Sequence, residues 1–118
     1  MNKILEMNDV EKMRKIPVLI WELNKKRIKK VRELLETKDK MEKIKREIER
    51  EVYNEVDEKG KKIYSNEAMR KNEIGIRLEN EKFKNLENKY REIKFEIEEI
   101  ENDVEFLKNV QENTKVLM

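Results

Sequence analysis

A dense run of positive charge is the clearest candidate for binding chemistry in this sequence. Residues 24–32 read Asn-Lys-Lys-Arg-Ile-Lys-Lys-Val-Arg, with six positive charges in nine residues and no acid. On a helix these charges cover much of the circumference, so they can contact the phosphates of DNA or RNA without reading the base sequence. The candidate nucleic-acid-binding residues are Lys25, Lys26, Arg27, Lys29, Lys30 and Arg32.

An acidic run near the C-terminus supplies the alternative interpretation. No base lies between Phe95 and Leu107, a segment that contains Glu96, Glu98, Glu99, Glu101, Asp103 and Glu105. If the two runs pair, the basic run is a charged structural face, and we favour this alternative over nucleic-acid contact. The acidic run does not predict a cation site, because its carboxylates point several ways around one helix.

A second candidate site lies in the middle of the chain, where an aromatic residue stands among positive charges. Such a segment can seat an acidic partner or stack on a base, although it can also be a turn that only aids solubility. The candidate partner-binding tip consists of Lys59, Lys61, Lys62, Tyr64 and Arg70.

Composition excludes several classes of chemistry. The 118 residues suffice for one domain, and 47% of them are charged while only 36% are apolar. The absence of Cys and His excludes zinc fingers, disulfide frameworks, thiol nucleophiles and imidazole catalysis. There is no Gly-rich phosphate loop or Ser-based nucleophile motif. We therefore expect no catalytic residues, no cofactor, no metal site and no enzymatic activity.

The C-terminal half contains a heptad pattern typical of a coiled coil. The pattern weakens upstream, where Glu79 takes a core position and Gly75 disfavours the helix. We expect one long helix over residues 66–113, with an apolar seam that serves as its core or its oligomer interface. The seam residues are Phe83, Leu86, Tyr90, Ile93, Ile97, Ile100, Val104 and Leu107.

The N-terminal half predicts a second long helix with a less regular seam. Its apolar residues recur at helical spacing from Trp21 through Ile28 to Val52. Pro17 lacks a backbone donor, so we expect a short helix over residues 1–16 and a new helix over 17–52. Residues 16–23 are apolar almost all round the helix, which predicts burial from more than one side.

Residues 52–65 predict a β-hairpin that turns at Asp57 to Gly60, although an irregular polar loop is the alternative. Tyr53 would then face Tyr64, and Gly60 would supply a positive φ. In this register residue i lies opposite residue 117 − i, so the two long helices are antiparallel. Ser65 and Asn66 are suitable N-caps for the second helix.

Together these elements predict an all-α fold: an antiparallel coiled-coil helical hairpin in a single domain over residues 1–118, with a short β-hairpin at its tip and a Pro-interrupted N-terminal helix. Because two helices bury only one stripe each, we expect a homo-oligomer, a dimer or higher, with a folded-back N-terminal helix as the monomeric alternative. Neither a membrane-spanning segment nor a signal peptide is recognisable, so we expect no membrane contact and a cytoplasmic location.

The segment Asp57-Glu58-Lys59-Gly60-Lys61, followed by Tyr64-Ser65-Asn66-Glu67, Arg70 and Arg77-Leu78-Glu79, resembles a family signature. It is similar to that of small, uncharacterised helical-hairpin proteins of bacteriophages and mobile elements, often encoded near DNA-recombination genes. The resemblance covers residues 52–79 and implies that Ser65, Asn66 and Glu67 begin the second helix. A weaker, architectural resemblance is to prefoldin subunits, which also join two long helices by a β-hairpin.

The predicted function is that of a non-enzymatic coiled-coil scaffold of phage or mobile-element type. We expect it to bind a protein partner through the tip or the N-terminal apolar cluster, and to modulate a nucleic-acid-processing or host-defence protein. If the chain is phage-encoded, it would act in the host cytoplasm. The alternatives are direct, non-sequence-specific nucleic-acid binding through residues 25–32 and a prefoldin-like chaperone activity.

Overall fold

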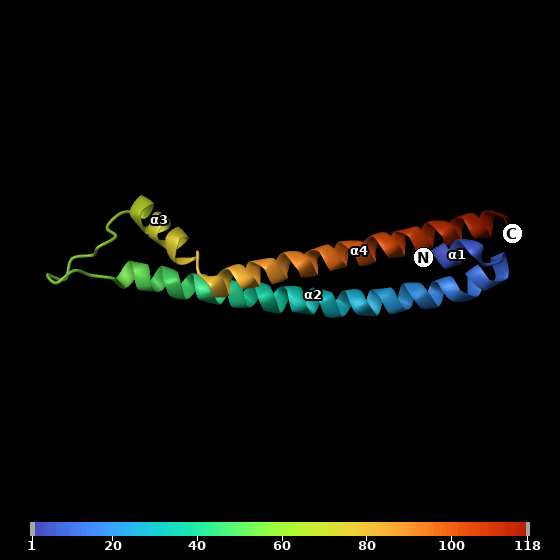
Figure 1. The fold of residues 1–118 in the computed structure, drawn as a ribbon, viewed down its shortest axis with the longest axis horizontal. Helices are drawn as coiled ribbons and strands as arrows, with labels where there is room; N and C mark the ends of the chain where they lie inside the picture. Colours follow the sequence, from blue (N-terminus) through green and yellow to red (C-terminus); the bar gives the residue numbers. More distant parts are fainter. Residues whose placement is uncertain (1, 118) are drawn as a thin grey trace. The chain divides into compact units, whose positions relative to one another are not determined.

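The structure, a computed structural model, describes residues 2–117 and forms four α-helices (Figure 1). They are α1 (Asn2–Glu6), α2 (Asp9–Asn54), α3 (Glu67–Arg77) and α4 (Glu81–Leu117). Residues 2–117 contain no β-strand, so the predicted all-α class is confirmed. The chain forms two compact units. Unit 1 combines the chain up to Leu34 with the chain from Glu92 onward, and unit 2 consists of Leu35–Arg91.

Asparagine side chains begin three of the helices. The Asn8 side chain accepts a hydrogen bond from the backbone N–H of Glu11 at 2.9 Å and donates one to the Glu11 carboxylate at 3.2 Å, which is a capping box at the start of α2. Asn66 accepts from the N–H of Met69 at 2.9 Å, and Asn80 accepts from the N–H of Phe83 at 2.7 Å. Each cap satisfies a donor that the first helical turn leaves free.

The predicted helix boundary at Pro17 is wrong, because Pro17 lies inside α2. The chain instead breaks at residues 7–8, where the Asn8 capping box ends the preceding turn. The cost of Pro17 within the helix is offset by its neighbour Ile16, which is completely buried. The capping motif therefore decides where the helix begins, and the proline does not.

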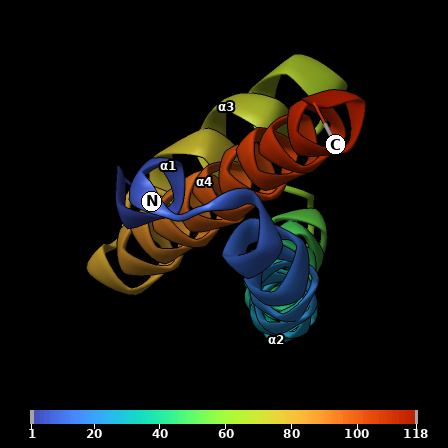
Figure 2. The same ribbon diagram turned by 90° about the vertical axis from the view of Figure 1, so that its right-hand side faces the viewer.

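Unit 1 has a core formed by three helices. Ile4 of α1 packs with Ile16 of α2 and with Leu107 and Val110 of α4. The ribbons of α1, α2 and α4 can be followed in Figure 2. The partly buried side chains that surround this cluster are Met7, Leu19, Ile20, Leu23 and Phe106. The N-terminal segment thus folds back and packs Ile4 against Leu107 and Val110 of α4, while the expected homo-oligomer stays a prediction.

Unit 2 contains no β-hairpin, and this prediction is wrong. α2 continues through Tyr53 to Asn54, which buries Val52 completely, and only the isolated antiparallel bridge between Val56 and Lys62 follows. The Asp57 carboxylate closes the turn by accepting the N–H groups of Lys59 at 2.9 Å and Lys61 at 3.0 Å. An isolated two-stranded hairpin is only marginally stable in water, so the chain extends α2 instead of forming the first strand. Gly60 does have the expected positive φ, at 78°.

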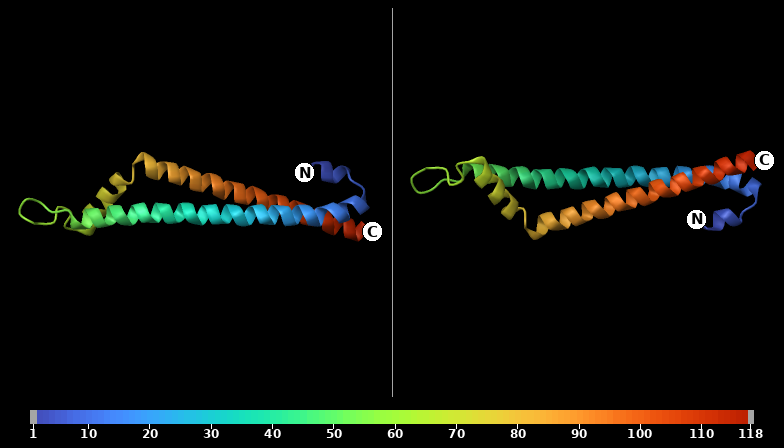
Figure 3. Two further views of the ribbon diagram at one scale, coloured as in Figure 1. Left: turned by 90° about the horizontal axis from the view of Figure 1, so that it is seen from below. Right: turned by 90° about the horizontal axis from the view of Figure 1, so that it is seen from above.

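The expected continuous helix over residues 66–113 is divided at residues 78–80, where α3 turns away from α4 (Figure 3). Asn80 both caps α4 and donates to the backbone carbonyl of Arg77 at 2.9 Å, which fixes this bend. The bend changes the pairing between the long helices. The predicted register places Arg27 near Tyr90, whereas Arg27 contacts Glu101.

Replacing Leu107 by Ala is expected to lower the free energy of unfolding by about 2–5 kcal/mol, because the side chain is 0% exposed and would leave a cavity. Urea unfolding followed by far-ultraviolet circular dichroism measures this loss. The control is Val116→Ala at an 84% exposed position of the same helix, where the expected change is below about 0.5 kcal/mol. Equal losses in the two variants would contradict the described core.

Candidate functional site

The six cations of residues 25–32 divide between two sides of α2 in unit 1. Two of them pair with the acidic run of α4. Arg27 Nε lies 3.2 Å from Glu101 Oε1, and Lys30 Nζ lies 2.5 Å from Glu96 Oε2. The expected pairing of the basic and acidic runs is therefore present for Arg27 and Lys30. The ion pairs found among the described residues do not include Lys25, Lys26, Lys29 or Arg32.

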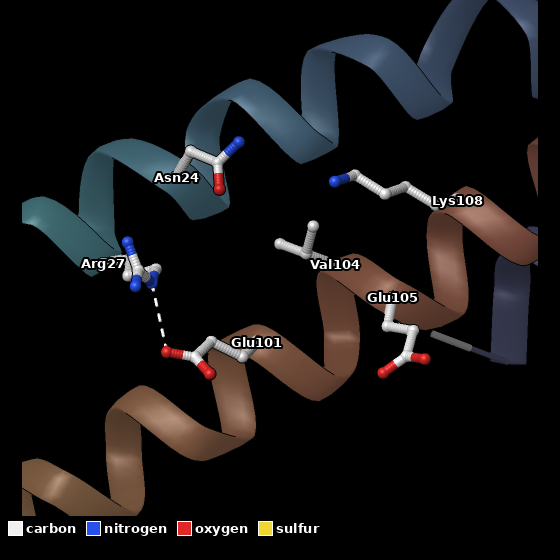
Figure 4. A pocket seen from close by; sticks show the side chains of 6 residues that line it. All are labelled: Asn24, Arg27, Glu101, Val104, Glu105 and Lys108. Carbon is white, nitrogen blue, oxygen red and sulfur yellow. Dashed lines mark hydrogen bonds and ion pairs between the residues drawn. The ribbon is translucent and has the colours of Figure 1, made fainter.

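The Arg27–Glu101 pair lies in an open pocket of about 390 Å³ between α2 and α4 (Figure 4). Lys108 and Asn24 extend into the same space, and Glu105 points away from α2. The side chains of the pair are 44% and 50% exposed, so water and salt screen their attraction. The pocket holds opposite charges, and the Arg27–Glu101 ion pair links α2 to α4 within unit 1.

Lys30 is held by two carboxylates. Its pKa is raised above the ordinary value chiefly because the ammonium donates a hydrogen bond to Glu96, and the charge of Glu33 adds to this effect. Lys30 therefore stays protonated over the whole range in which a lysine can contact a phosphate. Glu96 and Glu33 already pair with the ammonium group, so Lys30 is a poor candidate for nucleic-acid contact.

The other side of α2 presents an exposed apolar and basic surface, which we call the Trp21 face. The indole of Trp21 is 60% exposed, and Val18 and Ile28 are more than half exposed on the same stripe. Lys25 Nζ lies 4.4 Å from the centroid of the Trp21 ring, which is a cation–π contact. The Trp21 face consists of Val18, Trp21, Lys25, Ile28, Lys29 and Arg32, all of which are exposed.

Sequence reasoning missed this surface, because it placed Trp21 and Ile28 in a buried seam and expected residues 16–23 to be buried from several sides. In unit 1 only one side of that segment is covered. Ile16 is buried and Leu19, Ile20 and Leu23 are partly buried against the core. The signal that could have revealed the face is the seven-residue spacing of Trp21 and Ile28, with the polar residues Asn24 and Lys25 at the intervening helical positions.

The candidate partner-binding residues at the tip of unit 2 form two groups that differ in exposure. Lys59, Lys61 and Lys62 are exposed. Tyr64 and Arg70 are half-buried. Arg70 stacks over the Tyr53 ring with its guanidinium carbon 4.6 Å from the centroid and donates to the backbone carbonyl of Tyr64 at 3.4 Å. Tyr64 and Arg70 therefore hold the tip together, while partner binding by the three lysines stays a prediction.

Arg77 connects the parts of unit 2, a role that sequence reasoning did not assign. Its guanidinium bonds to Glu55 of the turn segment and, at 2.8 Å, to Glu73 of α3, and it lies 4.0 Å from Glu51 of α2. The hydrogen bond to Glu55, and after it the hydrogen bond to Glu73, raise the pKa of Arg77, so the group stays charged. The planar fork of an arginine can bind several carboxylates at once, which a lysine cannot do equally well.

The predicted seam residues of α4 differ between the two units. In unit 1, Ile93, Ile97, Ile100, Val104 and Leu107 are buried. In unit 2, Phe83, Leu86 and Tyr90 are only half-buried. The seam thus serves as an intramolecular core in unit 1, and its use as an oligomer interface stays a prediction.

The described residues hold no group of three or more Asp or Glu side chains arranged to bind a metal ion. Nor is any helix within residues 2–117 both long and apolar enough to cross a membrane. Comparisons with family models, with curated proteins and with solved structures found no match to this chain. The candidate site is therefore argued from the geometry of its own residues.

Replacing Arg77 by Ala is expected to speed hydrogen exchange of the α3 backbone amides several-fold, because α3 loses its links to Glu55 and Glu51. Mass spectrometry of α3 peptides measures the change, and Arg77→Lys should give an intermediate rate. The control is Lys71→Ala, which removes an ion pair of 3.2 Å between two exposed side chains of the same helix. Equal exchange rates in both Ala variants would contradict the connecting role of Arg77.

Proposed function

We propose that this chain is a non-enzymatic helical binding protein that engages an acidic protein surface through the Trp21 face. The observation that supports the proposal is the 60% exposure of Trp21 among cations. A single exposed apolar residue needs no explanation, but Val18, Trp21 and Ile28 form one stripe along a helix. Tryptophan and arginine are also the residues that most often dominate binding energy at protein interfaces.

The charges around the stripe define the chemistry of the partner. Lys25, Lys29 and Arg32 lie at helical spacing beside Trp21 and Ile28, and Glu22 is the acid next to Trp21 in a shallow pocket of about 380 Å³. A complementary surface therefore offers an apolar socket for the indole, surrounded by carboxylates. The partner class expected from the sequence, a nucleic-acid-processing or host-defence protein, stays part of this proposal.

Direct nucleic-acid binding is the second candidate, and it now rests on fewer residues. Arg27 and Lys30 are engaged by Glu101 and Glu96, which leaves Lys25, Lys26, Lys29 and Arg32 for phosphates. Trp21 favours a single strand, because an exposed indole can stack on a base. Nothing observed supports a prefoldin-like chaperone, since residues 2–117 lack the β-hairpin on which that resemblance depends.

The test uses a synthetic amphipathic helix with a leucine stripe flanked by glutamates, and a matched peptide with lysines in place of the glutamates. Trp21 is the only tryptophan in the chain, so its emission reports directly on this face. We expect the acidic peptide to shift the emission to the blue and the basic peptide to leave it unchanged. In fluorescence anisotropy with labelled acidic peptide, Trp21→Ala and Lys25→Glu should each weaken binding about tenfold.

Lys84→Glu is the control, because it reverses one exposed lysine of α4 that is not part of the Trp21 face. It should leave peptide affinity within about twofold of the wild type, as expected for an exposed charge outside the binding face that salt screens. Labelled single- and double-stranded oligonucleotides are titrated in parallel over a range of salt. Binding of the oligonucleotides with a steep salt dependence, without binding of the acidic peptide, would replace the proposal by the nucleic-acid alternative. Binding of neither probe would reject the Trp21 face as a binding site.

A further inference from the structure

The apolar seam of unit 2 lacks a covering element. Phe83, Leu86 and Tyr90 of α4 are half-buried, and so are Met41 and Ile44 of α2. In unit 1 the corresponding seam of α4 is buried from Ile93 to Leu107, and α1 contributes Ile4 only beside Leu107 and Val110. The seam of unit 2 is therefore less completely covered than the seam of unit 1.

One side of this seam is open as a groove of about 590 Å³ between α2 and α4, here called the lysine groove. Met41, Phe83 and Tyr90 line a separate, smaller groove of about 260 Å³. Ile44 and Leu86 supply the apolar surface of the lysine groove, and Glu47 is its one acid. Four lysines and one asparagine complete the lining: Lys40, Lys43, Lys82, Lys89 and Asn85. Four like charges around apolar side chains create a positive potential that a basic or neutral occupant does not relieve. The groove therefore suits an acidic amphipathic helix.

This chain itself displays such a helix face. Phe95 of α4 is 60% exposed although it is a large aromatic residue. Glu92, Glu98 and Glu99 lie at the three- and four-residue spacings from Phe95 that place them on the same face, and all three are exposed. Arg91 lies at the remaining four-residue spacing and pairs with Glu87 at 3.8 Å, so the face carries three glutamates and one arginine. None of these glutamates takes part in an ion pair found among residues 2–117, in contrast to Glu96 and Glu101. We call this surface the Phe95 face.

We propose that two copies of the chain associate by inserting the Phe95 face of one copy into the lysine groove of the other. Leu86 and Phe95 lie on the same helix, so Phe95 cannot pack into the groove that its own α4 lines. The Trp21 face is excluded as the occupant, because its lysines and arginine would be repelled by those of the groove. The contact pairs a half-buried seam with an exposed aromatic residue and opposes lysines with glutamates.

Cysteine cross-linking tests the contact directly, because the chain has no native cysteine. Asn85→Cys places one thiol in the groove, and Phe95→Cys places one on the opposing face. Mixing the two variants under mild oxidation should give a disulfide-linked dimer in greater yield than either variant alone. Ile28→Cys, exposed on the Trp21 face, is the control and should not link to Asn85→Cys. Preferential linkage of Ile28→Cys would overturn the proposal.

Charge reversal gives an independent test by analytical ultracentrifugation. Lys82→Glu with Lys89→Glu, or Glu98→Lys with Glu99→Lys, should each weaken self-association at least about tenfold, because like charges then face each other. A mixture of the two double variants should form a heterodimer. The glutamates in the groove of one variant then oppose the lysines on the Phe95 face of the other. Circular dichroism checks that each variant keeps its helices.

A wild-type chain that remains monomeric would overturn the proposal. So would double variants that self-associate as strongly as the wild type. The Trp21 face is unaltered in the two double variants, so each should still bind the acidic peptide. Failure of self-association is therefore distinguishable from failure of the proposed partner binding.

Discussion

The apolar stripe of α4 is the constraint on which the rest of this structure depends. A long amphipathic helix is stable in a protein only when its stripe is removed from water, since propensity alone contributes little. In unit 1, Ile4 of the short helix α1 packs against Leu107 and Val110 and completes a three-helix core. In unit 2 the stripe stays half-buried at Leu86, and this incomplete burial is the observation behind the proposed contact between the lysine groove and a second chain.

The packing of α2 against α4 also determines which charged side chains form ion pairs and which stay exposed. Once Arg27 and Lys30 turn toward Glu101 and Glu96, helical spacing directs the remaining cations of residues 25–32 to other sides of α2. The long basic run is therefore not one uniform surface. Part of it aligns two helices, and part of it surrounds the exposed Trp21. A comparable division occurs on α4, where Glu96 and Glu101 pair internally while Glu98 and Glu99 remain on the Phe95 face.

Short polar contacts decide the irregular parts of the fold. Asn8, Asn66 and Asn80 begin helices by accepting backbone N–H groups. Asp57 closes the turn near Gly60, and Arg77 holds α3 to the end of α2 through Glu55 and Glu51. The asparagine caps and the Asp57 turn join residues close together in the sequence, so they fix the helix starts and the turn without a large core. The Arg77–Glu55 contact joins residues 22 positions apart and depends on how the chain folds back.

The sequence by itself determined the all-α class, the seam from Phe83 to Leu107 and the positive φ of Gly60, because helical periodicity and glycine stereochemistry are local properties. It also contained the capping residue Asn66. Only the tertiary structure decided that Trp21 is exposed, that α2 passes through Pro17, and that Arg27 meets Glu101. A heptad pattern marks which residues are apolar, but burial depends on which element covers them. The bend at residues 78–80 shifts the helix register, and such a shift follows from long-range packing that one helix cannot reveal.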